Sequence, residues 1–221
     1  IRHSGLDFPI PDATGALRGV GGTRNCDWWF TNEAILLDTA GRFATQEDDH
    51  DEWIAFLDML RKYRTQTPIN GVIVGISISD VIGHTEEQLE QTAKTLRTRI
   101  DEVMTRLQMV VPVYVVFTKV DLIAGFVETF EDLKKSERAQ IWGVTFPLAM
   151  ITGKDFDAGK AFEAELDVLL QALHANALRR VGQARDPKVR ARAEQFPLEM
   201  RAAKQALSDF VSALLRKNTF Q

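Results

Sequence analysis

Between positions 35 and 42 the chain reads Ile35-Leu36-Leu37-Asp38-Thr39-Ala40-Gly41-Arg42. A short apolar run, residues 34–37, precedes the aspartate, and a turn of small residues follows it and ends in glycine. A buried strand that ends on a carboxylate, with glycine three residues later, is how nucleotide-hydrolysing α/β domains place two groups. In that arrangement Asp38 faces the Mg²⁺ shell and the backbone N–H of Gly41 faces a terminal phosphate. The pattern D-x-x-G is common by chance, so its weight depends on the rest of the chain.

A second motif lies where another strand is expected to end. Residues 110–117 form an apolar run typical of a buried strand, and Thr118-Lys119-Val120-Asp121 follows it. In GTPases a loop of this type reads guanine, because a carboxylate can accept from both donors of guanine whereas adenine offers a different edge. We therefore expect Asp121 to accept from the base, the stem of Lys119 to lie along the base plane, and Thr118 to hold the loop in place.

The order of the expected elements predicts a P-loop GTPase-like α/β fold, a mostly parallel sheet with helices on both faces. The expected elements are an antiparallel strand pair at 27–31 and 34–37, a doubly buried strand at 72–78, a helix at 86–108, a strand at 110–117, a helix at 130–141 and a strand at 143–148. Ligands of such sheets lie beyond the carboxyl ends of the strands, where Asp38 and Asp121 are expected. Residues 1–152 are expected to form this domain, and residues 153–221 a helical extension whose second helix begins near Pro197.

Composition excludes some classes of protein. The chain has 221 residues, enough for one good core. Its net charge of −4 and pI near 5.6 argue against nucleic acid as the main partner. The single cysteine, Cys26, excludes an internal disulfide, and no apolar run approaches the roughly 18 residues that a bilayer-spanning helix needs.

Two charged runs each allow two interpretations. Five of the six residues 47–52 are acidic, which suits the start of a helix; a cation site that adds His50 is the alternative. Residues 179–192 contain six basic residues and one acidic residue. This second run is either a solvated helix surface or a docking patch for an acidic protein or lipid headgroups.

A phosphate-binding G-x-x-x-x-G-K-[S/T] loop is absent from the sequence. The opening Ile1-Arg2-His3-Ser4-Gly5 has no Met and reads like the end of a helix. Because a helix follows such a loop, we expect the P-loop to lie just upstream in the native protein. The fragment alone is then expected to bind nucleotide poorly or not at all.

Segments spread over nearly the whole chain also carry a family resemblance. They include Gly22-Thr23-Arg24-Asn25-Cys26-Asp27-Trp28-Trp29-Phe30, Asp38-Thr39-Ala40-Gly41-Arg42, Pro68-Ile69-Asn70-Gly71-Val72 and Thr118-Lys119-Val120-Asp121-Leu122. Together they resemble the cytoplasmic domain of the IcmF/TssM family, large inner-membrane proteins of type VI secretion systems.

The resemblance implies an NTPase-like domain on the cytoplasmic face of the bacterial inner membrane, with Mg²⁺ and GTP or ATP as cofactors of the intact domain. Asp38 would hold Mg²⁺ through water, Gly41 would sense the terminal phosphate, and Thr23 would close on both. Thr118, Lys119 and Asp121 would hold the base. The implied partners are the inner-membrane subunit TssL, cytoplasmic baseplate proteins and, through a periplasmic region elsewhere, the lipoprotein TssJ.

The motifs and the resemblance together leave three functions open. The first is a nucleotide-dependent switch or NTPase in assembly and docking of the secretion apparatus. The second is a degenerate NTPase fold that serves as a docking scaffold, with nucleotide optional. Arg42 stands where many small GTPases place a water-orienting Gln, which argues against fast intrinsic hydrolysis. The third, a targeting GTPase of the signal-recognition type, is disfavoured because Leu122 replaces the Gly that normally follows the T-K-x-D aspartate.

Overall fold

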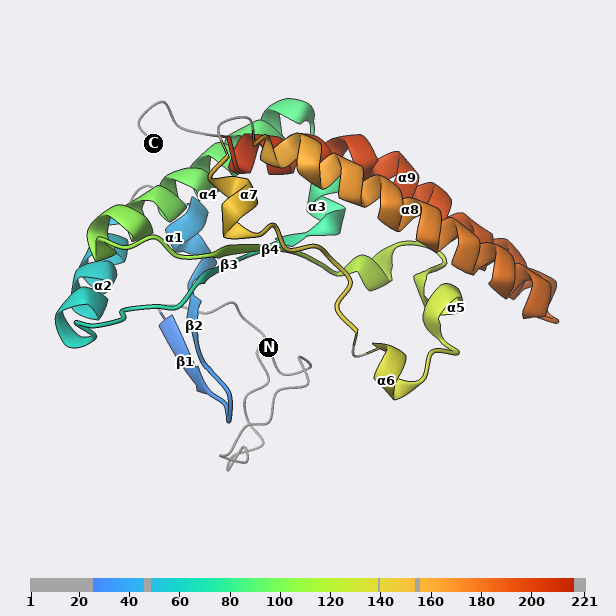
Figure 1. Cartoon of the computed structure of the whole chain (residues 1–221), viewed down its shortest axis with the longest axis horizontal. Helices are drawn as coiled ribbons and strands as arrows, with labels where there is room; N and C mark the ends of the chain where they lie inside the picture. Colours follow the sequence, from blue (N-terminus) through green and yellow to red (C-terminus); the bar gives the residue numbers. More distant parts are fainter. Residues whose placement is uncertain (1–25, 46–48, 139, 154–155, 217–221) are drawn as a thin grey trace. The chain divides into compact units, whose positions relative to one another are not determined.

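A computed structural model describes residues 26–45, 49–138, 140–153 and 156–216 (Figure 1). The described residues form a mixed α/β structure with two sheets of two strands each, and parallel order is limited to one of the two pairs. The chain divides into two units. The first comprises Ile1–Pro68 with Asp101–Met109, and the second comprises Ile69–Ile100 with Val110–Gln221. No helix in the described ranges is both long and apolar enough to cross a membrane.

In the first unit the two predicted neighbouring strands form an antiparallel hairpin, β1 (Cys26–Phe30) and β2 (Ile35–Thr39). Thr31 closes the turn: its amide N–H donates to the carbonyl of Ala34 at 2.9 Å, and its hydroxyl accepts from the Ala34 amide at 2.9 Å. The antiparallel strand pair expected at 27–31 and 34–37 is therefore confirmed.

Three helical segments supply the core of the first unit. They are α1 (Gly41–Thr45), α2 (His50–Tyr63) and the last turns of α4 (Glu86–Leu107). Their buried side chains are Phe43, Trp53, Leu57, Leu60, Val103 and Leu107. Polar contacts join α2 to α4 as well: Glu102 accepts from Trp53 Nε1 at 2.8 Å and lies 2.9 Å from His50 Nε2.

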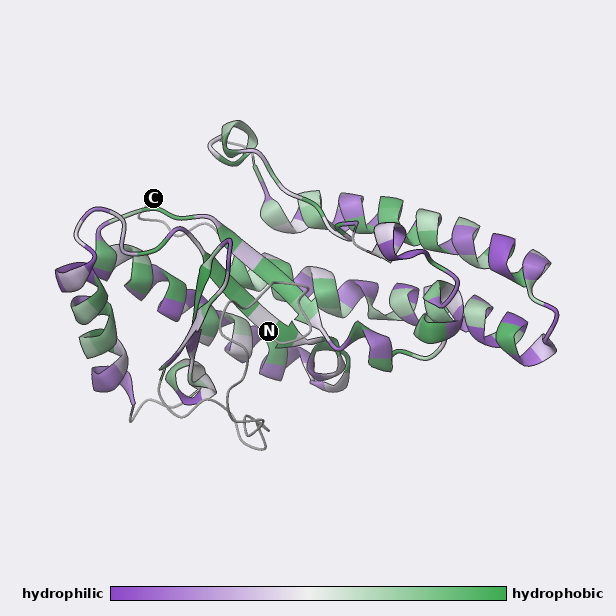
Figure 2. Ribbon diagram, turned by 90° about the horizontal axis from the view of Figure 1, so that it is seen from below, coloured by the Kyte–Doolittle hydropathy of each residue, from purple (hydrophilic) through white to green (hydrophobic). Residues whose placement is uncertain are grey.

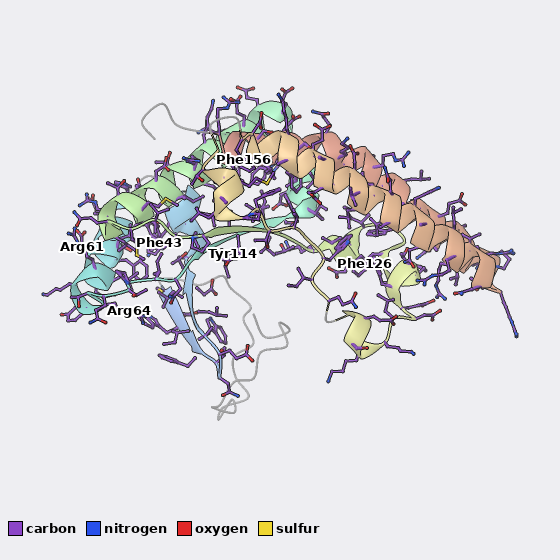
Figure 3. All side chains as sticks on the ribbon, in the orientation of Figure 1. Phe43, Arg61, Arg64, Tyr114, Phe126 and Phe156 are labelled. Carbon is purple, nitrogen blue, oxygen red and sulfur yellow. The ribbon has the colours of Figure 1, made fainter. Side chains whose placement is uncertain are left out.

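In the second unit β3 (Val72–Ser77) pairs in parallel with β4 (Val113–Thr118). Val74 and Ile76 are buried, but Ile73 is 63% exposed. Tyr114, labelled in Figure 3, projects from β4 and is 51% exposed. The prediction of a strand buried on both faces is therefore wrong here, because an apolar run does not reveal which of its alternate faces is covered.

A short helix missed from the sequence, α3 (Ile78–Gly83), begins directly after β3. Its buried residues are Ile78 and Val81. The apolar run expected to be one long strand therefore ends at Ser77, and Ile78 belongs to the helix. The chain continues into α4, which confirms the helix predicted at 86–108. Its buried residues in this unit include Leu89, Ala93 and Ile100.

The segment after β4 departs from prediction. It contains a 3₁₀ turn η1 (Val120–Leu122), α5 (Phe126–Phe130), α6 (Lys135–Arg138) and α7 (Leu148–Ile151). The predicted helix 130–141 is wrong, because α5 ends at Phe130 and the chain turns so that Trp142 packs edge-on against Phe130, 5.9 Å between ring centroids. The predicted strand 143–148 is also wrong: no strand forms there, and Pro147, which has no N–H, caps α7.

Two long antiparallel helices, α8 (Ala158–Gln183) and α9 (Pro187–Leu214), lie side by side (Figures 1 and 2). Asp186 starts α9 by accepting from the amide of Lys188 at 2.8 Å, and Pro187 occupies the first helical turn. The prediction of a start near Pro197 is wrong, since that proline is inside α9. The facing stripes are Leu166, Leu170, Leu173 and Ala177 on α8, and Ala193, Met200, Ala203, Leu207 and Val211 on α9.

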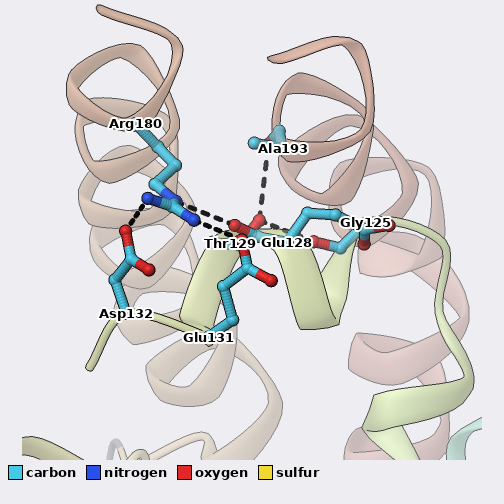
Figure 4. Close-up of polar contacts among 7 residues, drawn as sticks. All are labelled: Gly125, Glu128, Thr129, Glu131, Asp132, Arg180 and Ala193. Atoms are coloured by element: carbon cyan, nitrogen blue, oxygen red, sulfur yellow. Dashed lines mark hydrogen bonds and ion pairs between the residues drawn. The ribbon is translucent and has the colours of Figure 1, made fainter. Parts of the chain in front are cut away.

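Helix α5 docks where Pro197 interrupts α9. A proline inside a helix removes the hydrogen bond to the carbonyl four residues earlier, here that of Ala193. Thr129 of α5 is buried, and its hydroxyl lies 3.4 Å from the Ala193 carbonyl and 2.7 Å from that of Gly125 (Figure 4). The shorter bond of Thr129 goes to Gly125, and the hydroxyl offers a second, longer one to the carbonyl that the proline leaves without a helical partner.

Arg180 of α8 holds the other side of the same helix. Its Nε donates to the Glu128 carbonyl at 3.0 Å, and its Nη atoms pair with the carboxylates of Glu131 and Asp132 (Figure 4). The Arg180 side chain is only 12% exposed, so these contacts fix α5 and the turn after it against the hairpin.

The role of Thr129 is testable with a double-mutant cycle. Thr129→Val keeps the shape but removes the hydroxyl bonds to the carbonyls of Gly125 and Ala193, so we expect a loss of about 1 kcal/mol in unfolding free energy. In a Pro197→Ala background the helix regains its own N–H donor, and Thr129→Val should then cost clearly less. Urea unfolding of the four proteins measures this, and equal costs in both backgrounds would show that Thr129 does not serve the proline site.

Candidate functional site

The carboxylate of the D-T-A-G segment lies inside a strand. Asp38 is the fourth residue of β2, not the residue after it, and is half-buried. It is directly opposite Asp27 of β1. Burial, and then the negative charges of Asp27 and Asp38, raise the pKa of the Cys26 thiol. Cys26 is therefore protonated at neutral pH and is not placed to act as a nucleophile.

Gly41 and Arg42 open α1 directly after this strand. Gly41 is exposed, and an added Cβ would meet nothing within 4 Å. The Arg42 guanidinium donates to Glu52 at 2.7 Å, pairs with Asp49 and lies 4.6 Å from the ring centre of Phe43. The hydrogen bond to Glu52 is the main cause that raises the pKa of Arg42, so this cation is held by the start of α2.

The same contacts bear on the acidic run at residues 47–52. Asp49 and Glu52 pair with Arg42, and His50 pairs with Glu102. Within the described ranges, no group of three His, Cys, Asp or Glu residues could hold a metal ion. Asp49, His50 and Glu52 thus make local polar contacts at the start of α2.

The T-K-V-D loop begins at the carboxyl end of β4. Thr118 is level with Ser77 at the end of β3, and its hydroxyl donates to the Ile76 carbonyl at 3.3 Å, which ties the strand end to its neighbour. Lys119 has φ 60° and ψ 28°, in the left-handed region that costs a non-glycine residue roughly 1 kcal/mol. The Leu122 amide donates back to the Lys119 carbonyl at 3.0 Å and closes the turn.

The structure brings three of the predicted site residues together. Thr118, Lys119 and Asp121 are exposed on one strand-end loop of the second unit, where they offer a hydroxyl, an ammonium and a carboxylate. Asp38 and Gly41 belong to the first unit. Thr23 lies outside the described residues.

One residue near the loop was missed from the sequence. Ser77 is 7% exposed, and its Oγ has no hydrogen-bond partner among the described residues. The available signal was a small polar residue at the end of an apolar strand, but its pairing with Thr118 follows only from the register.

Comparison with known proteins identifies the family. The family of the IcmF-related N-terminal domain matches residues 46–221. The chain is 42% identical over 228 residues to the type VI secretion system component TssM1 of Pseudomonas aeruginosa. The match covers 100% of this chain and 20% of that protein, so the chain spans about a fifth of its relative's length. No solved structure matches the chain. The chain belongs to the IcmF/TssM family.

Proposed function

We propose that the chain is a nucleotide-binding domain of a type VI secretion membrane-complex protein and acts as a switch in assembly and docking of the apparatus. Family membership supports the secretion role, since the whole of this chain matches a fifth of TssM1 and residues 46–221 match the IcmF-related domain. The T-K-V-D loop supports the nucleotide role. Its position beyond the end of a parallel strand is where α/β sheets bind ligands.

The backbone of Lys119 is the observation that carries the proposal. A non-glycine residue in the left-handed region persists only where its surroundings fix it, and such residues cluster at ligand sites. Here the Thr118 hydroxyl and the Leu122 amide fix both sides of Lys119. The loop is thus preorganised in the absence of a base, which lowers the entropic cost of binding a nucleotide.

In this proposal each residue has one role. Asp121 accepts from the donors of guanine, the Lys119 stem covers the base and Thr118 anchors the loop. When the P-loop is present, Mg²⁺ would neutralise phosphate charge, and the half-buried carboxylate of Asp38 suits an ion that keeps much of its water. Gly41 would contact the terminal phosphate, and Thr23 would complete the ligands.

The proposed setting is the cytoplasmic face of the inner membrane. The proposed partners there are TssL and baseplate proteins, while TssJ would be reached through a periplasmic region of the longer protein. The name of the relative, a type VI secretion component, supports this setting.

The second candidate is a docking scaffold that does not need nucleotide turnover. The contacts of Arg42 favour it: at the position where small GTPases orient water, the guanidinium is engaged by Glu52 and Asp49. A titration of the full-length protein with GTP and with ATP, each with Mg²⁺, separates the two candidates. Binding of either nucleotide supports the switch, and no binding of both up to millimolar concentration supports the scaffold.

The base contact has its own test in the full-length protein. Asp121→Asn exchanges an acceptor for a donor, so we expect the affinity for GTP to fall by about tenfold or more and that for xanthosine triphosphate to rise. Asp58→Asn, an exposed aspartate of α2, is the matched control and should leave both affinities unchanged. Isothermal titration calorimetry measures the constants, and an unaltered base preference in Asp121→Asn would remove Asp121 from the site.

A further inference from the structure

The loop end of the α8–α9 hairpin concentrates positive charge. Residues 179–192 carry a net charge of +5 in a chain whose net charge is −4. The basic residues are Arg179, Arg180, Arg185, Lys188, Arg190 and Arg192, and the single acidic residue is Asp186. Figure 2 shows hydrophilic colouring at this end of the two helices.

Two of the six cations are used inside the fold. Arg180 pairs with Glu131 and Asp132, and Arg192 lies 3.0 Å from Glu128. These contacts hold α5 on the hairpin. The run of basic residues in the sequence therefore overstates the free charge.

The other four cations, Arg179, Arg185, Lys188 and Arg190, form what we call the hairpin-tip patch. All four are exposed, and within the described ranges none has a carboxylate within ion-pair distance. The middle of the same hairpin differs: Lys204 lies 3.0 Å from Glu163 and 2.8 Å from Asp167. Lys204 is thus neutralised by carboxylates of α8, whereas the described residues offer no such partners to the four cations at the tip.

Two of the four cations occupy positions that do not favour the stability of the hairpin. Lys188 and Arg190 lie at the start of α9, where the helix dipole disfavours cations. The carboxylate within residues 179–192, Asp186, accepts from the Lys188 amide as the helix cap. Neutralising Lys188 and Arg190 should therefore not weaken the fold.

We propose that the hairpin-tip patch docks on an acidic protein surface. Three of its four cations are arginines, whose planar fork pairs with carboxylates in two hydrogen bonds and is enriched in protein interfaces. Residues 179–192 contain no aromatic residue and no Leu, Ile or Met, so the tip lacks the side chains that anchor a basic helix in a lipid interface. The inference does not depend on nucleotide binding.

The test compares two triple variants that each remove three positive charges. R185Q/K188Q/R190Q alters the patch, and K134Q/K135Q/R201Q alters exposed cations elsewhere in the second unit. Fluorescence anisotropy of a labelled polyglutamate peptide, titrated with the full-length protein at low and physiological salt, reports binding. At physiological salt we expect the patch variant to bind about tenfold more weakly, with the control within about twofold of wild type, because the short Debye length there limits the effect to local charge.

Melting temperature and vesicle binding are measured alongside the peptide titration. The melting temperature of the patch variant should be unchanged or higher, which separates lost docking from lost folding. Equal weakening by both triple variants would reduce the effect to overall charge and overturn the proposal. Vesicles rich in phosphatidylglycerol that bind more tightly than polyglutamate, and lose binding in the patch variant, would instead assign the patch to a membrane surface.

Discussion

Replacing Gly125 with alanine is expected to lower the free energy of unfolding by about 3 kcal/mol or more. Gly125 has φ +83°, a conformation that costs any L-residue energy. A Cβ there would also lie 2.0 Å from the carbonyl oxygen of Arg192 and 3.0 Å from the amide nitrogen of Phe196. Both are backbone atoms of α9, so no side-chain rotation can relieve the clash, and α5 would have to move off the hairpin.

Gly182→Ala is the matched control for this substitution. Gly182 lies inside α8, and a Cβ there meets nothing within 4 Å. The alanine should raise stability by about 0.5–1 kcal/mol, because glycine is the weaker helix former. Urea unfolding of both variants gives the comparison, and a Gly125→Ala protein as stable as wild type would show that α5 is not seated on α9.

Gly125 also explains how the candidate site is joined to the rest of the second unit. The T-K-V-D loop continues through η1 and reaches α5 within a few residues. Because Gly125 lets α5 approach the α9 backbone, Thr129 and Arg180 can complete the joint. The loop is thus anchored at one end by the sheet and at the other by the hairpin.

The elements that sequence predicted well are those whose signal is local. The apolar stripe of α4 repeats over 22 residues, and its bounds agree with prediction at both ends within one residue. The turn at Thr31 and the strands β3 and β4 likewise depend on short patterns of residue type. These elements form as the local sequence predicts because no contact with a distant residue changes them.

The wrong predictions concern segments whose structure depends on contacts with residues far away in the sequence. The sequence from Phe130 onward has helical spacing, but the ring of Phe130 packs against Phe196 as well as Trp142, which requires the chain to turn. Pro197 reads as a helix start, yet Thr129, far away in sequence, compensates for its missing hydrogen bond. In both cases one partner of the contact lies far away in the sequence, so the local pattern of residues does not reveal it.

The candidate site was also predictable only where its features depend on residues close in sequence. Thr118, Lys119 and Asp121 are close in sequence, so their grouping was predictable, whereas the left-handed backbone of Lys119 was not. The engagement of Arg42 by Glu52 spans ten residues and depends on where α2 begins. Sequence therefore identified the chemistry of the loop but not the contacts that hold its neighbours.

Gly159→Ala is the second substitution for which we expect a large effect, a loss of about 2–3 kcal/mol in unfolding free energy. A Cβ at this buried position of α8 would lie 1.9 Å from Ser212 Oγ, 2.8 Å from Ser212 Cβ and 3.2 Å from Ser212 Cα on α9. Rotation of Ser212 moves its hydroxyl but not its Cβ, so most of the overlap remains. The absence of a side chain at Gly159 is what lets the two helices approach at this end of the hairpin.

A compensating change on α9 separates this clash from other causes. Ser212→Gly removes both atoms closer than 3.0 Å and should by itself cost about 1 kcal/mol as a glycine inside a helix. If the helices meet as described, the double variant Gly159→Ala/Ser212→Gly is more stable than Gly159→Ala alone, because the new methyl group occupies the space that the serine leaves. Strictly additive losses in urea unfolding would show that α8 and α9 do not meet at this pair.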